Sequence, residues 1–331
     1  MSTESHANSI SKRIEKKLNA PSIIDALARN LSPSDLNSLL TEVFAQRSEC
    51  ITPSSLFKQY SQSTYAQPAT HSAAQYRALE ADMLALAERN GIKGVILSPA
   101  ALFGCCSAFD AVSQNKIISA TRNLEVLSDA TNMLALHIAQ AIRNGDMSHD
   151  AWPIHVCTTH RHIRYQKFFP KGYTPHFGLF VMVSAGRAES AYAFEIAALQ
   201  FHLNFYINYW KERFGETLLL RLNPRLGYKD ASGFFSRVYQ ALQSSLPDVH
   251  MEVDDRENTT AYYKGLRVTM NTVINGQKIE IGDMGFTDWT QRLLGRSGER
   301  LLISSMALDF QLVKMGERKA GITSAIRACG T

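Results

Sequence analysis

The sequence has 331 residues, of which 45% are hydrophobic and 20% are charged, and its formal net charge is +5. This is the composition of an ordinary globular protein, and no run approaches the ~18 consecutive apolar residues of a membrane helix. Because residues 1–19 are polar and basic, without the apolar core of a signal peptide, we expect a cytoplasmic protein with no membrane partner.

Residues 1–70 are expected to form a helical extension. Residues 32–35 (Ser-Pro-Ser-Asp) supply an N-cap, a proline at the first helical position and an acid in the first turn. An amphipathic stripe follows over 36–44, and 52–54 (Thr-Pro-Ser) repeat the cap. Residues 61–71 have the composition of a linker, so the main domain is expected to span 71–331.

The next elements alternate between helices and short strands. A helix from Ser72 is predicted to end at Asn90-Gly91, since this pair favours a left-handed stop, and an apolar strand over 92–97 follows. Residues 116–121 and 125–127 are predicted to be short strands. Asp129 then caps a helix that ends at 144–145 (Asn-Gly).

The rest of the chain is rich in strands, and these are predicted over 154–158, 162–167, 179–184, 218–222, 251–253, 266–273 and 278–281. Helices are predicted over 192–214 and 233–245. Asn275-Gly276 separates the last two strands and is typical of a two-residue hairpin turn. The pattern predicts an α/β (α+β) fold in which an antiparallel sheet is flanked by helices.

A basic, aromatic segment around residue 164 is the first candidate for chemistry. Residues 160–167 alternate as in a strand, so His162, Arg164 and Gln166 are expected to share one face and to line a wet cavity. Arg164 could there hold a carboxylate or a phosphate through two hydrogen bonds. An exposed sheet face without a ligand is the other interpretation.

Several common kinds of site are not supported by the sequence. His155, His160, His162 and His176 lie close together, but they differ in strand parity and no carboxylate has a matching spacing, so we expect no metal site. The five cysteines form no Cys-x-x-Cys pair, and they are expected to be reduced and mostly buried. No glycine-rich phosphate loop, dinucleotide fingerprint or Gly-x-Ser-x-Gly elbow is present.

The order of elements over residues 72–315 resembles the catalytic core of class II aminoacyl-tRNA synthetases. It is most similar to the branch that contains histidyl-tRNA synthetase and the regulatory subunit of ATP phosphoribosyltransferase. Residues 72–99, a helix and a strand that end in proline, are similar to motif 1, which builds the dimer interface of the family. The resemblance therefore implies a homodimer.

The resemblance also assigns roles to residues of the second quarter of the chain. Asp129, which precedes Thr131, matches the acidic residue that receives the ammonium group of the substrate. Arg164 matches the motif 2 arginine that contacts the ATP α-phosphate and the amino-acid carboxylate. Gln166 stands where an acidic residue is usual, and we expect it to contact the substrate.

Further matches follow along the chain. Phe177 matches the aromatic residue that stacks on adenine, and its neighbour His176 is expected to lie at the nucleotide as well. Tyr262 and Tyr263 resemble the paired tyrosines of the histidyl branch, and Asp288 belongs to a segment similar to its Gly-Arg-Tyr-Asp element. We expect these three residues to bind the substrate. The arginine that precedes the tyrosines in the family is absent, since Asn258 takes its place.

Motif 3 departs most from the family. Its terminal arginine, which clamps the ATP γ-phosphate, is replaced by Phe310, and Arg292, Arg296 or Arg300 are the candidates for a substitute charge. About 20 residues follow Phe310, whereas this branch carries an anticodon-reading domain of ~100 residues there. Ordinary tRNA charging is therefore not expected.

Three functions remain open. The first is ATP- and Mg²⁺-dependent adenylation of an amino acid or related carboxylate, followed by transfer to an acceptor other than a canonical tRNA, such as a carrier protein. The second is a non-catalytic paralogue that senses an amino acid and regulates a partner enzyme. The third is RNA binding by the N-terminal helices, which the net positive charge would favour.

Overall fold

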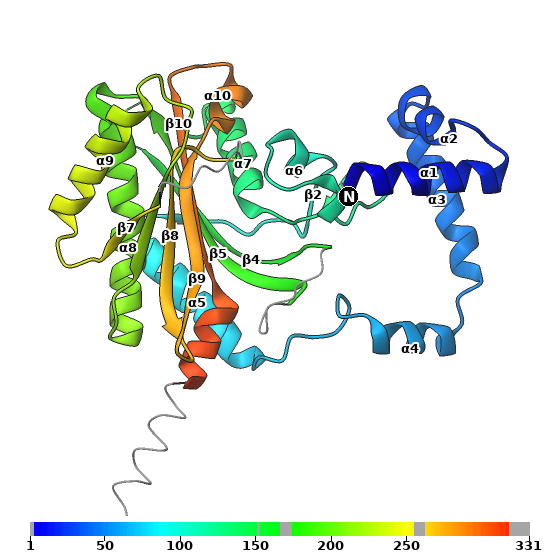
Figure 1. Ribbon diagram of the computed structural model, residues 1–331, viewed down its shortest axis with the longest axis horizontal. Coiled ribbons are helices and arrows are strands. Elements are labelled where there is room, and N and C mark those ends of the chain that lie inside the picture. Colours follow the sequence, from blue (N-terminus) through cyan, green and yellow to red (C-terminus); the bar gives the residue numbers. More distant parts are fainter. Residues whose placement is uncertain (1–2, 151–152, 166–173, 255–261, 318–331) are drawn as a thin grey trace, which may run out of the picture.

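The computed structural model describes residues 3–150, 153–165, 174–254 and 262–317. Its body is an eight-stranded sheet with helices on both faces, and the N-terminal helices extend away from this body (Figure 1). The strand order is β1-β4-β5-β10-β9-β8-β6-β7, and all neighbours run antiparallel except the pairs β1–β4 and β6–β7. The predicted fold class is confirmed.

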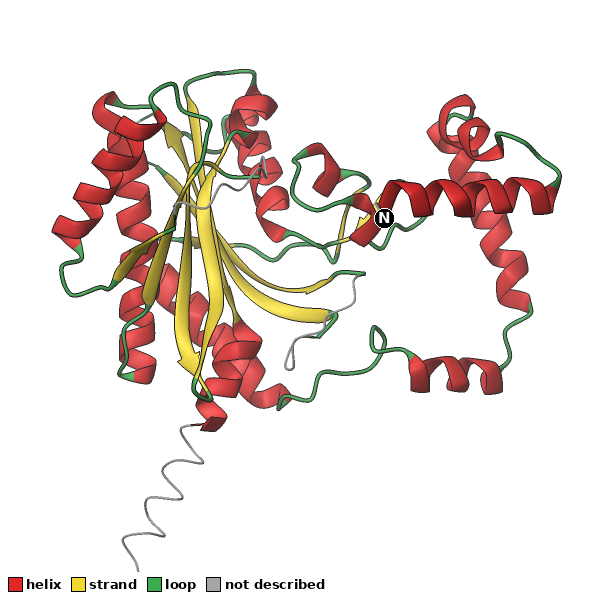
Figure 2. Cartoon of the chain, in the orientation of Figure 1, coloured by secondary structure: helices red, strands yellow, loops and turns green. Residues whose placement is uncertain are grey.

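Two long hairpins form the centre of this sheet (Figure 2). Asn275 and Gly276 close the β8–β9 hairpin with positive φ angles of 50° and 74°, as the sequence predicts. The strands are β1 (Lys93–Gly94), β4 (Ile154–Ile163), β5 (His176–Arg187), β6 (Leu219–Pro224), β7 (Met251–Val253), β8 (Lys264–Ile274), β9 (Gln277–Thr287) and β10 (Glu299–Ala307). A separate ribbon pairs β2 (Ala100–Leu102) with β3 (Leu124–Val126).

One face of the sheet is covered by α5 (Ala73–Arg89), α8 (Ala193–Phe214), α9 (Ala231–Ser245) and the helical residues 308–317. The large side chains of Tyr206 and Trp210 on α8 are fully buried there. Burial of each such side chain stabilises the fold by about 1.5–3 kcal/mol. The helices α5 and α8 are followed by Gly91 and Gly215, which adopt the left-handed conformation. Glycine is favoured there because it has no Cβ that would clash at positive φ.

The other face carries α7 (Ala130–Asn144), α10 (Trp289–Leu294) and the short α6 (Cys105–Ala108). Leu134 and Ile138 of α7 pack with Trp289 and with Val181 and Val183 of β5. These apolar contacts fix the N-terminus of α7 above the β4–β5 hairpin. That position matters because Asp129 is the N-cap of α7.

The N-terminal extension consists of α1 (Thr3–Leu18), α2 (Ile23–Asp25) with a π-helical turn (Ala26–Asn30), α3 (Pro33–Glu49) and α4 (Pro53–Gln62). Ser32 caps α3 and Thr52 forms a capping box with Ser55, as the sequence predicts. No residue of α2, α3 or α4 is buried, so their apolar stripes face solvent. The Asn37 side chain joins α3 to the body by accepting from the Arg122 amide at 2.5 Å.

A chain of buried polar side chains runs beneath β5 and β10. The Ser184 hydroxyl lies 2.6 Å from His155 Nδ1 and 2.6 Å from His202 Nε2. The other ring nitrogen of His202 lies 2.8 Å from the Ser304 hydroxyl, which is also 3.0 Å from that of Tyr206. Burial lowers the pKa of His202 well below its ordinary value, so this ring is neutral.

The structure corrects several predicted boundaries. The strands predicted at 154–158 and 162–167 are one strand, β4, because its hydrogen bonding to β5 is continuous through Ile163. Only residues 93–94 of the predicted strand 92–97 pair, and 116–121 hold a single bridge at Ser119 instead of a strand. His162 is fully buried, so it does not belong to a wet face.

The described cysteines agree with the expectation that most of them are buried. Cys105, Cys106 and Cys157 are buried free thiols, and Cys50 is exposed. No helix in the described part of the chain combines the length and the apolar character that crossing a membrane requires.

Candidate functional site

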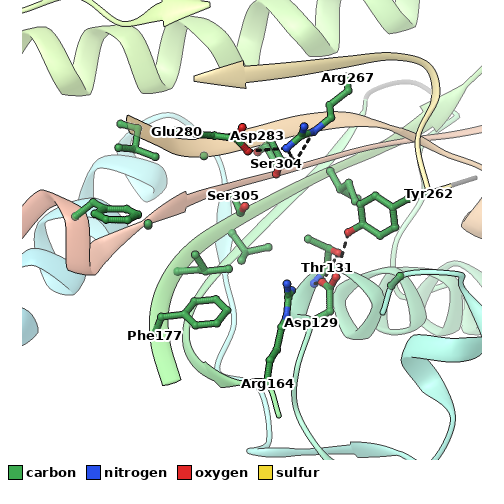
Figure 3. Close-up of a pocket in the computed structure, with 18 of the residues that line it drawn as sticks. Asp129, Thr131, Arg164, Phe177, Tyr262, Arg267, Glu280, Asp283, Ser304 and Ser305 are labelled. Carbon is green, nitrogen blue, oxygen red and sulfur yellow. Dashed lines mark hydrogen bonds and ion pairs between the residues drawn. The ribbon is translucent and has the colours of Figure 1, made fainter. Parts of the chain in front are cut away.

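A cavity of about 420 Å³ lies over the sheet, between the N-terminus of α7 and the strands β5, β8, β9 and β10 (Figure 3). Six of the nine residues singled out from the sequence line it, namely Asp129, Thr131, Arg164, Phe177, Tyr262 and Tyr263. The first and the last of these residues, Asp129 and Tyr263, are 134 positions apart in the chain, and the fold brings them together. The cavity is therefore the candidate site.

Asp129 is held at the start of α7 by three hydrogen bonds. One carboxylate oxygen accepts from the backbone amide of Thr131 at 2.9 Å and from its hydroxyl at 2.6 Å. The other oxygen accepts from the Tyr262 hydroxyl at 3.0 Å. Burial together with the charge of Asp129 raises the pKa of Tyr262 well above its ordinary value. Tyr262 is therefore a neutral donor beside a fixed anion.

Arg164 lies just after β4, next to this anion. Its Nε and Nη2 atoms both donate to the carbonyl of Ser128 at 3.3 Å, and its guanidinium lies 5.5 Å from the centre of the Phe177 ring. Because Ser128 precedes Asp129, the cation lies near the carboxylate. Among the described residues, however, no carboxylate oxygen lies within 4.0 Å of Arg164. Its charge is available to a ligand.

His162 supports both of these groups from behind. Its Nε2 atom accepts from the backbone amide of Ala130 at 3.1 Å, which satisfies one of the free amides at the start of α7. Its ring stacks on Phe177 with a centroid separation of 5.8 Å. Burial lowers the pKa of His162 well below its ordinary value, so the ring stays a neutral acceptor. His162 positions the site without touching a ligand.

The wall opposite Arg164 and Asp129 carries a charged triad that sequence reasoning missed (Figure 3). Arg267 donates through Nε to Asp283 at 3.0 Å and through Nη2 to Glu280 at 2.6 Å. Burial raises the pKa of Glu280, against the lowering effect of Arg267. The sequence places these three charged residues on two strands joined by a hairpin turn, and the sequence analysis did not single them out.

The motif 3 end of the cavity is formed by Asp309 and Phe310. One oxygen of Asp309 accepts from the Gly178 amide at 2.6 Å, and the other lies 3.6 Å from Arg161 and 3.5 Å from His71. This carboxylate is thus already engaged by the protein.

None of the arginines considered as a substitute cation lines the cavity. Arg300 pairs with Glu195 at 2.8 Å, and Arg292 donates to the carbonyl of Ala108 at 2.5 Å. Arg296 lies 3.8 Å from Glu299. None of these three arginines therefore supplies the charge of the motif 3 arginine, whose place is taken by Phe310.

Two other predicted residues, His176 and Asp288, do not line the cavity. His176 accepts from Arg161 at 3.0 Å through Nδ1 and faces the carbonyl of Gln67 at 2.8 Å through Nε2, which ties the linker to β5. Asp288 lies 3.5 Å from Lys264 at the start of α10. Gln166 lies outside the described residues, and so does Asn258, which stands where the family has an arginine.

A metal centre has no support in the described part of the chain, where no three His, Cys, Asp or Glu side chains form a group suited to a metal ion. The histidines of the β4–β5 hairpin bond to protein groups instead, as in the pairs His155–Ser184 and His176–Gln67.

Comparison with known proteins yields structural matches alone, because no protein-family model and no curated sequence matches this chain. Apo histidyl-tRNA synthetase of S. aureus superposes with a TM-score of 0.57 and 12% identity, over 77% of this chain and 70% of that one. An ATP phosphoribosyltransferase regulatory subunit/histidyl-tRNA synthetase from Bacillus halodurans C superposes with a TM-score of 0.56 and 10% identity, over 80% and 90%. A threonyl-tRNA synthetase fragment of Cryptosporidium parvum Iowa II, described as its RNA binding domain, superposes with a TM-score of 0.57 and 10% identity, over 77% of this chain and 66% of that one.

These matches show that the body of the chain has the core fold of class II aminoacyl-tRNA synthetases, as its resemblance to the family implies. At 10–12% identity they show the fold alone. What the cavity does has to be argued from its own residues.

Proposed function

We propose that this chain, whose body is a class II synthetase-like core, binds a free amino acid in the cavity and acts as an amino-acid-responsive regulatory module. One observation carries the proposal: the guanidinium of Arg164, which has no carboxylate partner among the described residues, and the fixed carboxylate of Asp129 line one wall of the same cavity. An α-amino acid carries the complementary charges on adjacent atoms. Its carboxylate would accept two hydrogen bonds from Arg164, and its ammonium group would donate to Asp129.

The charges of the described cavity lining support a ligand other than a nucleoside triphosphate. Its lining contains two cations, and one of them, Arg267, is already neutralised by Asp283 and Glu280. Phe310 occupies the position of the γ-phosphate arginine. Asp309, the acidic residue beside it, is engaged by the Gly178 amide. Since carboxylates outnumber cations on the walls, a polyanion would be repelled. We therefore propose binding that needs neither ATP nor Mg²⁺.

The Bacillus halodurans match supports a regulatory role. The chain covers 90% of that protein, which is described as an ATP phosphoribosyltransferase regulatory subunit/histidyl-tRNA synthetase. A regulatory module would pass the occupancy of its cavity to a partner enzyme. The linker offers a route, because Gln67 and His71 contact His176 and Asp309 at the cavity's edge.

Adenylation of the bound amino acid, with ATP and Mg²⁺ and with transfer to a carrier protein or another acceptor that is not a canonical tRNA, is the second candidate. The pairing of Arg164 with Phe177 favours it, since the resemblance assigns these residues to the α-phosphate and to adenine. Both candidates require the same amino-acid site. They differ in whether the nucleotide binds.

Isothermal titration calorimetry of the full chain against the common amino acids, with and without ATP and Mg²⁺, tests the proposal. We expect binding of one amino acid or a small group, unchanged by ATP, and no exchange of pyrophosphate into ATP. Arg164→Gln should weaken binding about 10- to 150-fold, because a charge-assisted hydrogen bond contributes about 1.5–3 kcal/mol. Arg292→Gln, outside the cavity, is the matched control. Amino-acid-dependent exchange would favour adenylation, and no binding at all would refute both candidates.

We also propose that the chain is a homodimer. Ile96, Leu102 and Phe103, which lie in or directly after the motif 1-like segment, are large apolar side chains exposed to solvent in the single chain. Exposed apolar side chains gathered in one segment are typical of an interface. Sedimentation velocity should give twice the mass of one chain, and Ile96→Asp should shift it toward the monomer.

A further inference from the structure

The charges of the cavity walls do not balance when a simple amino acid is bound. Arg164 and Asp129 would be compensated by the two ends of the zwitterion. The opposite wall holds one cation, Arg267, between two carboxylates, Asp283 and Glu280. This triad keeps an uncompensated negative charge, and it lines the cavity.

The two neighbouring arginines among the described residues do not line the cavity. Arg221 lies 3.6 Å from Glu252, with which it pairs, and its charge also acts on Glu280 from outside the lining. Arg225 is also outside the lining, and its pKa is lowered by burial and by the nearby charge of Arg267, so it is repelled by the triad's own cation. Among the described residues that line the cavity, the triad therefore presents one more carboxylate than cations.

A local irregularity of the sheet creates the triad. Glu280 and Asp283 are three positions apart, which in a regular strand puts their side chains on opposite faces. The β8–β9 register shifts between Met270 and Asn271, whose partners are Gly282 and Glu280, so Ile281 is an extra residue in β9. Such a bulge brings both carboxylates to the same guanidinium.

The geometry points to an amino acid that carries a second cationic group on its side chain, with Glu280 and Asp283 as the residues that select it. This inference rests on the proposed function. The carboxylate and the ammonium group would lie at Arg164 and Asp129, and an extended aliphatic stem would pass Tyr262. The distal amino or guanidino group would reach the triad on the opposite wall (Figure 3).

Arg267 and Asp283 are partly buried, and Glu280 is the most exposed member of the triad. The side chains of Glu280 and Asp283 are 44% and 24% exposed, so water screens them only in part. A neutral stem of the same length would remove water from these carboxylates without supplying a donor, which costs binding free energy. A cationic end would supply the donor and the charge together.

Two pairs of nearly isosteric ligands test the inference with the full chain: lysine against norleucine, and arginine against citrulline. We expect the cationic member of at least one pair to bind about tenfold tighter, the factor that ~1.4 kcal/mol of extra interaction gives. Glu280→Gln should reduce this preference, and Glu280→Gln with Asp283→Asn should abolish it. Glu212→Gln is the matched control, because Glu212 is an exposed residue of α8 outside the cavity and should leave the preference unchanged.

The outcomes separate this inference from the proposed function. If norleucine and citrulline bind as tightly as lysine and arginine while Arg164→Gln still weakens them, the second cation is refuted and the amino-acid site stands. A preference that survives both substitutions at Glu280 and Asp283 would also refute the role of the triad. Circular dichroism of each variant establishes that it is folded.

Discussion

The clearest separation of stability from binding is expected at Asp129, because this carboxylate both caps α7 and faces the cavity. Asn is as good an N-cap as Asp, so Asp129→Asn retains the hydrogen bond from the Thr131 amide and changes stability by less than ~0.5 kcal/mol. Asp129→Ala loses the cap, at about 1 kcal/mol, and leaves the Tyr262 hydroxyl without this partner, at about 1–3 kcal/mol. We expect a total loss of roughly 2–4 kcal/mol.

The affinity for an amino acid should depend on the negative charge at position 129 and not on the helix cap. Both Asp129 variants lack the anion that would receive the ligand's ammonium group, so each should bind lysine about 10- to 150-fold more weakly, from ~1.5–3 kcal/mol for a hydrogen bond to a charged group. Urea unfolding followed by circular dichroism gives the stability, and calorimetry gives the affinity. Wild-type affinity in Asp129→Asn, or wild-type stability in Asp129→Ala, would refute this reasoning.

Two further predictions concern stability. Because the pKa of His202 is lowered in the fold, the stability it contributes is present above the unfolded value of about 6.5 and is lost as pH falls below it. The urea concentration at the unfolding midpoint should therefore decrease when the pH is lowered from 7 to 5. The decrease should be smaller in His202→Gln, and in the exposed His250→Gln it should equal that of the wild type. A Cβ at Gly282 would overlap the carbonyl oxygen of Ser305, so Gly282→Ala should cost about 1–3 kcal/mol. Gly298→Ala meets nothing within 4 Å and should be neutral, and equal stabilities of the two alanine variants would contradict this account.

The elements that the sequence predicted well are those set by local chemistry. The cap at Ser32, the left-handed ends at Gly91 and Gly215 and the turn at Asn275-Gly276 depend on residues within one turn of each other. The length of β4 could not be predicted in this way, because its continuity depends on pairing with β5. Strand pairing is a property of two segments and not of one.

The residues of the candidate site also differ in whether they could be predicted without knowing how the strands pair. Arg164, Asp129 and Phe177 were identified because they occupy places in a recurring order of elements. The triad of Arg267, Glu280 and Asp283 was missed because it depends on a bulge, and a strict alternation puts its two carboxylates on opposite faces. The apolar residues of β9 do change parity at the bulge, from Ile279 and Ile281 to Met284 and Phe286, but this signal was not used in the sequence analysis.

The central claim is that the cavity binds a zwitterion between Arg164 and Asp129. A crystal structure of the full chain soaked with lysine, in the presence of ATP and Mg²⁺, tests it most directly. We predict that the lysine carboxylate accepts from Arg164, that its α-ammonium group donates to Asp129, and that no nucleotide lies in the cavity. Lysine bound elsewhere, or a triphosphate ordered along this wall, would contradict the account.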